Sequence, residues 1–152
     1  MPDFIGFILV LIGLVQLAAE SKRFINLKPW TLGMIIYTTV LYIFDLTGLS
    51  VHMYQFITVI SGLVSVAVSL YISYQTVLGI KDIEENKKAE LNSGALMKTW
   101  LVTAVFQVLS AVAAVNHFLM IVSLLGSFVT AIIFLVQLNK SSALYENFTQ
   151  LK

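Results

Sequence analysis

The 152-residue chain is 59% hydrophobic and only 11% charged, whereas soluble domains carry about 25% charged residues. This imbalance predicts that lipid, and not water, surrounds most of the chain. A net charge of +1 gives no general attraction to nucleic acid or to acidic substrates, and the chain contains no cysteine for disulfides or thiolate metal sites. The longest polar segment, 81–98, is much shorter than the roughly 50 residues of an independent soluble domain. We therefore predict one membrane domain over residues 1–152.

Five apolar segments approach or reach the roughly 20 residues that a helix needs to cross hydrocarbon. The first is followed, and not preceded, by Lys22 and Arg23, so we expect a retained helix and not a signal peptide. The predicted fold class is an all-α integral membrane protein, a bundle of five transmembrane helices. These helices are predicted at residues 3–19, 29–49, 53–80, 99–115 and 118–138.

Two of the breaks between these segments are short. Residues 45–52 interrupt the second apolar run with a charge, a glycine and hydroxyl side chains, which together predict a hairpin. Between Trp100 and Leu138 only Asn116 and His117 interrupt a run that is far longer than one crossing uses. The chain is therefore expected to turn near Asn116.

The positions of the basic residues predict the orientation. With five spans, all 9 Lys and Arg residues fall on one side, before residue 29, in the loop 81–98 or in the tail 139–152. Since Lys and Arg stay in the cytoplasm, the N-terminus is predicted outside and the C-terminus inside. Trp30 and Trp100 each follow a lysine by two residues and are predicted to anchor the inner interface.

The chain also contains a possible internal repeat. Residues 28–30 (Lys-Pro-Trp) and 98–100 (Lys-Thr-Trp) each open a predicted helix that runs toward a short turn. A tandem pair of two-helix hairpins would place His52 opposite His117 and Gly62 opposite Gly126 in the alignment, related by an axis along the membrane normal. The alternative is that Lys-x-Trp marks two interfaces independently, since glycine is common in membrane helices.

Small residues recur at every fourth position in two predicted helices. Such stripes allow two helix backbones to approach closely in lipid, where apolar bulk gives no drive for association. We expect them to be packing faces, either within one chain or between subunits. They comprise Ser61, Gly62, Ser65, Ser69 and Ser73 in the third helix, and Ser123, Gly126, Ser127, Thr130 and Ala131 in the fifth.

Few polar groups lie within the apolar runs. Asp45, His52 and His117 would gather at the outer side, where they can hold a metal or sense pH between about 5 and 7. The alternative is that they are solvated turn residues; because they show no ligand spacing, no metal site is predicted. Four glutamines have either a packing or a substrate-path role, namely Gln16, Gln75, Gln107 and Gln137.

The two inner polar segments carry helical patterns. Lys81 and Glu85 have the spacing of a helix-surface ion pair, which predicts that the third helix continues for two or three turns into the cytoplasm. Ser93 is a possible cap for the fourth helix. In the tail, one helical face predicts a short amphipathic helix on the inner leaflet or on a partner, formed by Leu144, Tyr145, Phe148 and Leu151.

The sequence has no His-Glu-x-x-His, Gly-x-Ser-x-Gly or phosphate-binding glycine loop. We therefore expect no catalytic residues and no cofactor. The function expected is that of a small non-catalytic multi-pass protein of the plasma membrane, with a composition that suits a bacterium. It would act through helix-helix contacts as a subunit, regulator or immunity-type partner of a membrane assembly. The alternative is a homo-oligomeric transporter or channel. Expected partners are the lipid bilayer and either another membrane protein or copies of the chain, and not nucleic acid.

Overall fold

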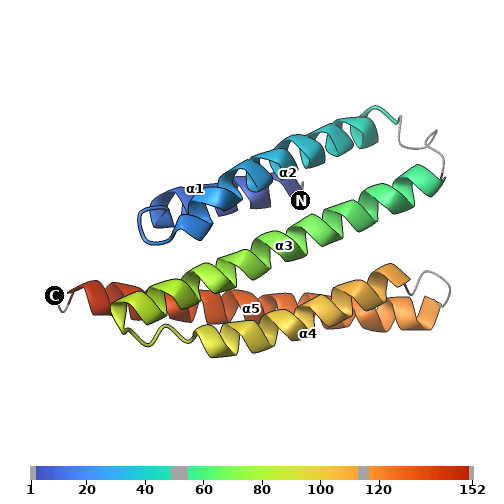
Figure 1. Cartoon of the computed structure of the whole chain (residues 1–152). Coiled ribbons are helices and arrows are strands. Elements are labelled where there is room, and N and C mark those ends of the chain that lie inside the picture. Colours follow the sequence, from blue (N-terminus) through green and yellow to red (C-terminus); the bar gives the residue numbers. More distant parts are fainter. Residues whose placement is uncertain (1–2, 49–54, 113–116, 151–152) are drawn as a thin grey trace. The chain divides into compact units, whose positions relative to one another are not determined.

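The computed structural model describes residues 3–48, 55–112 and 117–150, which form helices with short turns at 18–21 and 88–92 (Figure 1). No strand occurs in these three ranges. The elements are α1 (Asp3–Leu17), α2 (Lys22–Leu46), α3 (Gln55–Lys87), α4 (Ser93–Val112) and α5 (His117–Gln150).

Three helical stretches in the described residues are long and apolar enough to cross a membrane: Lys22–Leu46, Val59–Lys87 and Ile121–Gln150. A shorter apolar helix covers Phe4–Leu17. Large apolar side chains lie on the surface of these stretches, and Phe128 and Leu135 of α5 are 65% and 63% exposed. Such a surface suits hydrocarbon, in which a helix satisfies all its own backbone hydrogen bonds. The prediction of an all-helical membrane protein is confirmed at this level.

α2 begins seven residues earlier than predicted. The sequence placed its start at Pro29, but Pro29 lies inside the helix, which begins at Lys22. Ser21 has an extended backbone, and its side chain accepts a hydrogen bond from the Arg23 backbone N–H at 3.3 Å. This N-cap satisfies one of the free donors at the helix start. The predicted start was wrong because the N-cap at Ser21 begins the helix and Pro29 does not interrupt it.

α3 and α4 enclose a shorter loop than the predicted 81–98. α3 continues to Lys87, as the spacing of Lys81 and Glu85 predicted, and their side chains lie 3.6 Å apart. A left-handed residue, Lys88 (φ 52°), ends α3, and the Ala89 N–H donates to the Glu84 carbonyl at 3.2 Å. This is the pattern of a Schellman C-cap. α4 then begins at Ser93, and not at residue 99.

α5 does not end near Leu138 as predicted, but continues to Gln150. Residues 139–150 contain neither glycine nor proline, so the polar side chains that begin at Asn139 change the surface of the helix without breaking it. The predicted short tail helix is therefore the last part of α5, and Leu151 lies outside the described residues.

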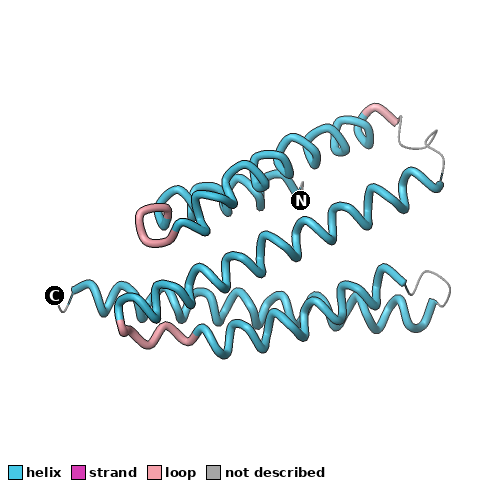
Figure 2. The backbone as a smooth tube through the Cα atoms, in the orientation of Figure 1, coloured by secondary structure: helices cyan, strands magenta, loops and turns pink. Residues whose placement is uncertain are grey.

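By its contacts the chain divides into two compact units, Met1–Gln75 and Thr76–Lys152. In the first unit α1 packs on α2 as a helical hairpin (Figure 2), and the rings of Phe4 and Tyr42 lie 5.7 Å apart. Leu14, Phe24 and Leu27 are buried there. In the second unit α4 packs along α5, and the buried residues of this unit include Val77, Ile83, Leu91 and Leu96.

The contact between α4 and α5 depends on a glycine. A Cβ atom built on Gly126 would overlap the ring of Phe106, whereas one built on Gly62 in α3 would meet nothing within 4 Å. Phe106 therefore sits against the α5 backbone at the one point where α5 has no side chain. This is the close approach that small residues permit in membrane helices.

We predict that Gly126→Ala lowers the stability of the protein by about 1–3 kcal/mol, because overpacking forces the Phe106 ring to shift. Thermal unfolding in mild detergent measures the effect. Gly62→Ala is the matched control, since it adds the same methyl group to open space. Combining Gly126→Ala with Phe106→Leu should restore part of the loss; a Gly126→Ala variant as stable as Gly62→Ala would contradict this account of the interface.

Candidate functional site

The outer cluster predicted from the sequence lies mostly outside the described residues. Asp45 is exposed near the end of α2, while His52 and the side chain of His117 are not among the residues described. Across the described ranges, no three His, Asp or Glu residues are grouped so as to hold a metal ion. The cluster stays a prediction.

The small-residue stripes differ in their surroundings. In α5, Ser123 and Thr130 are 1% and 8% exposed and share a face with Gly126, while Ser127 is half-buried. In α3, the Ser61 carbonyl accepts a hydrogen bond from the Tyr37 hydroxyl of α2 at 2.8 Å. At the other predicted positions of α3, Ser65 and Ser69 are half-buried, as Ser61 is, and Gly62 is exposed.

Hydroxyl side chains within the helices bond to their own backbone. Thr38 donates to the Met34 carbonyl at 2.7 Å, and Ser123 donates to the Leu119 carbonyl at 2.7 Å. The same bond to the preceding turn is made by Thr31, Ser73, Thr103 and Thr130. Among the described residues no buried side-chain nitrogen or oxygen lacks a partner. These hydroxyls are therefore satisfied without water.

A denser set of polar contacts joins the turn after α3 to α5, and we call it the polar junction. It links α3, the turn 88–92, the start of α4 and α5, all within the second unit. Its members are Glu84, Lys87, Leu91, Asn92, Ser93, Gln137, Ser141 and Tyr145.

Two contacts of the polar junction hold the turn to α5. The Asn92 amide donates to Gln137 Oε1 at 2.6 Å, and the Ser141 hydroxyl donates to the Leu91 carbonyl at 2.6 Å. Leu91 and Ser141 are only 2% and 4% exposed. Since a buried carbonyl without a partner is costly, the Ser141 hydroxyl fixes the path of the turn.

The other two contacts of the polar junction involve charged side chains of α3. Glu84 Oε2 accepts a hydrogen bond from the Ser93 backbone N–H at 3.0 Å. Ser93, predicted as a cap, is thus the first residue of α4, and Glu84 satisfies its free N–H where the helix dipole is positive. Lys87 Nζ donates to the Tyr145 hydroxyl at 3.0 Å and lies 4.9 Å from the centre of that ring. Tyr145 belongs to the predicted amphipathic face of the tail.

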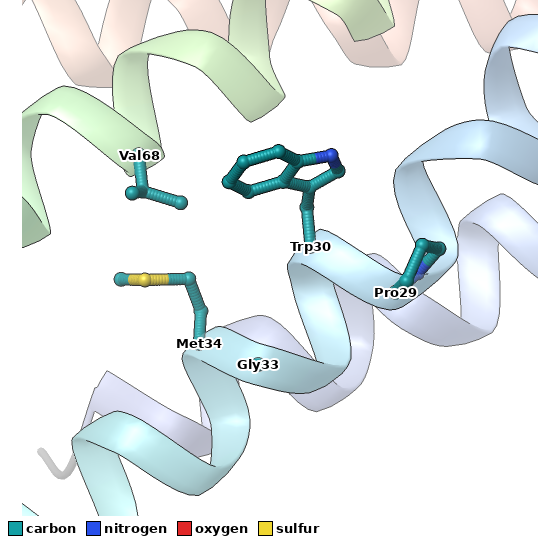
Figure 3. A pocket seen from close by; sticks show the side chains of 5 residues that line it. All are labelled: Pro29, Trp30, Gly33, Met34 and Val68. Carbon is teal, nitrogen blue, oxygen red and sulfur yellow. The ribbon is translucent and has the colours of Figure 1, made fainter.

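An apolar groove lies between α2 and α3 in the first unit, with a volume of about 390 Å³. Figure 3 shows the side chains of Trp30 and Met34 projecting from α2 toward Val68 of α3, and Pro29 and Gly33 complete the lining. A Cβ atom on Gly33 would meet nothing within 4 Å, so the groove is open at this point.

Three contacts between α2 and α3 surround this groove. The Tyr37 hydroxyl bonds to the Ser61 carbonyl on one side, as described above. On the other side the rings of Trp30 and Tyr71 meet edge to face with centres 5.4 Å apart, and Arg23 donates to Gln75 Oε1 at 3.3 Å. Of the two predicted interface anchors, Trp30 is 51% exposed and Trp100 of α4 is half-buried. Their place at the membrane interface stays a prediction.

The predicted glutamines have different roles. Gln75 and Gln137 each accept a hydrogen bond from another element, while Gln16 is exposed and Gln107 half-buried. Sequence reasoning missed the parts that Asn92 and Ser141 play in the polar junction. The left-handed backbone of Asn92 (φ 63°) could have been predicted, since asparagine adopts left-handed conformations more readily than most residues.

We predict that Ser141→Ala destabilises the protein by about 1–3 kcal/mol, because the buried Leu91 carbonyl loses its side-chain donor. Ser142→Ala is the matched control, since Ser142 is exposed on the same helix turn. Hydrogen exchange should report faster opening of residues 88–93 in Ser141→Ala only. Equal exchange in the two variants would show that the turn does not depend on this contact.

Comparisons of the chain with protein-family models, with curated proteins and with solved structures gave no match.

Proposed function

We propose that this protein is a non-catalytic multi-pass protein of the plasma membrane, in a bacterium, that acts through helix-helix contacts. It serves as a subunit, regulator or immunity-type partner of a larger membrane assembly. All five helices span the membrane as one domain over residues 1–152, with the N-terminus outside and the C-terminus in the cytoplasm. This arrangement keeps the 9 Lys and Arg residues on the cytoplasmic side.

The observation that carries this proposal is the polar junction. Its contacts hold the end of α3, the turn 88–92 and the start of α4 against α5, and its polar side chains bond within the chain. A surface that is already ordered costs less conformational entropy when a partner binds. The polar junction therefore suits a recognition surface.

The charges around the polar junction favour a protein as the partner. The exposed residues there alternate in sign, and they include Lys81, Glu85, Lys88, Glu90, Lys140 and Glu146. Anionic lipid headgroups bind clusters of basic residues. A surface with both positive and negative side chains is instead complementary to a protein surface on which these charges are reversed. We expect the partner to present such a surface next to its own membrane helices.

The alternative function, a homo-oligomeric transporter or channel, requires polar side chains that line a water path. Ser123 and Thr130, two buried hydroxyls of α5, share the face that packs on Phe106 of α4, and both bond to their own backbone. These observations support a packing role for the α5 stripe. They favour a protein that acts through helix-helix contacts with a partner over a transporter or channel with a polar water path.

A photo-crosslinking residue placed at Lys88 or at Glu146 tests the proposal in native membranes. We expect a discrete adduct with another membrane protein from both positions, and its yield should fall at least about tenfold with Glu at the neighbouring Lys81 or Lys140, because charge complementarity orients the partner.

The control position is Leu125 of α5, which is 62% exposed and apolar and should crosslink lipid. Adducts confined to copies of the chain would favour the homo-oligomeric alternative, and the absence of any protein adduct at Lys88 and Glu146 would refute a partner at the polar junction.

A further inference from the structure

The groove between α2 and α3 lies on the same face of α2 as two basic residues. A helix advances 100° per residue, so Arg23, Trp30 and Tyr37, each seven residues apart, lie almost in line. Lys22 and Gly33 fall on the same side. This face of α2 is therefore basic at its start and apolar farther along, where it forms one wall of the groove.

The start of α2 concentrates positive potential. Lys22 and Arg23 occupy its first turn, which contains no acidic residue. Helices usually carry acidic side chains there, because the helix dipole is positive at its N-terminus. Arg23 also donates to Gln75 Oε1 of α3, which holds its guanidinium on the groove side of α2. Glu20 directly precedes the N-cap Ser21, so residues 20–23 carry one acidic and two basic side chains, a net charge of +1. An anion beside this turn would offset this excess of positive charge.

The distance along α2 from its basic first turn to the groove is similar to the depth of the lipid headgroup layer. Seven residues separate Arg23 from Trp30, a rise of about 10 Å along the helix. The headgroup layer on each side of the hydrocarbon is about 5–8 Å deep. With the basic turn at the level of lipid phosphates, the groove begins in the hydrocarbon, and the Trp30 indole lies where such rings settle.

The groove itself suits a chain of methylene groups. Its lining side chains are Pro29, Trp30, Met34 and Val68, none of which carries a charge, and Gly33 leaves its floor open. Its volume of about 390 Å³ is more than twice that of an apolar cavity that binds benzene, about 150 Å³. An acyl chain fits this space better than a single side chain does.

We propose that this face of α2 and α3 binds one anionic phospholipid. The acyl chain lies in the groove over Gly33, between Trp30 and Val68, and the phosphate lies beside Lys22 and Arg23. The site rests on the membrane insertion that is part of the proposed function, and it is independent of any partner at the polar junction.

Quenching of Trp30 fluorescence by brominated acyl chains tests the site in the full-length protein, reconstituted in vesicles. The background variant is Trp100→Phe, which leaves Trp30 as the single indole. Brominated phosphatidylglycerol should compete for Trp30 at least about fivefold better than brominated phosphatidylcholine, since each basic residue near the surface contributes a factor of about five.

Three variants separate the headgroup from the acyl chain. Lys22→Gln with Arg23→Gln should abolish the preference for phosphatidylglycerol, whereas Lys28→Gln, a basic residue on the opposite face of α2, should retain it. Gly33→Leu fills open space, so the protein should fold while Trp30 quenching by both lipids falls. Gly62→Leu is the control for the added side chain.

Native mass spectrometry gives a second readout. The unmodified protein should retain a phosphatidylglycerol adduct that Gly33→Leu and the Lys22→Gln, Arg23→Gln variant both lose. Equal quenching by the two lipids, or an equal effect of Lys28→Gln, would overturn the headgroup site. Trp30 shielded from both lipids would mean that a protein covers the groove, and this would overturn the proposal whatever the crosslinking at Lys88 shows.

Discussion

Hydrocarbon offers no hydrogen-bond partner to a polar group, and this constraint explains most features of the structure. The backbone satisfies its own hydrogen bonds by forming helices over most of the described residues. The hydroxyl groups within those helices are satisfied in the same way, because they donate hydrogen bonds to the backbone carbonyl one turn earlier, as Thr38 and Thr130 do. Because these side chains are satisfied within their own helix, association of helices depends on shape, and Gly126 beneath the Phe106 ring is the clearest case.

Polar side chains connect different elements mainly where the apolar stretches end. In the second unit Glu84, Asn92 and Ser141 form such connections around one turn, and in the first unit Arg23 and Gln75 form another. Water can reach these levels of a membrane, so a hydrogen bond between elements costs less desolvation there than in hydrocarbon. The same ends carry the exposed charges, which is why both proposed recognition sites lie beside them.

The sequence predicted the helices well because each apolar run is long, but it placed several helix ends wrongly. The N-cap at Ser21 and the left-handed Lys88 are local features of geometry that composition does not report. The polar junction was not predictable from spacing, since Asn92 and Gln137 are 45 residues apart in the chain. Gly62 and Gly126 are aligned in the predicted repeat, but Gly62 lies beside open space and Gly126 lies against the Phe106 ring. The sequence could not predict this difference, because it depends on where the fold places Phe106.

The central claim of the proposed function is that residues 81–98 and the polar part of α5 from Asn139 onward face the cytoplasm. Labelling with an impermeant maleimide tests this claim most directly. The chain has no cysteine of its own, so single cysteines at Ser50, Asn86, Asn116 and Ser142 give four clean reports. The positive-inside rule predicts that in intact cells Ser50→Cys and Asn116→Cys are labelled, whereas Asn86→Cys and Ser142→Cys react only after the membrane is permeabilised. Labelling of Asn86→Cys in intact cells would contradict the account.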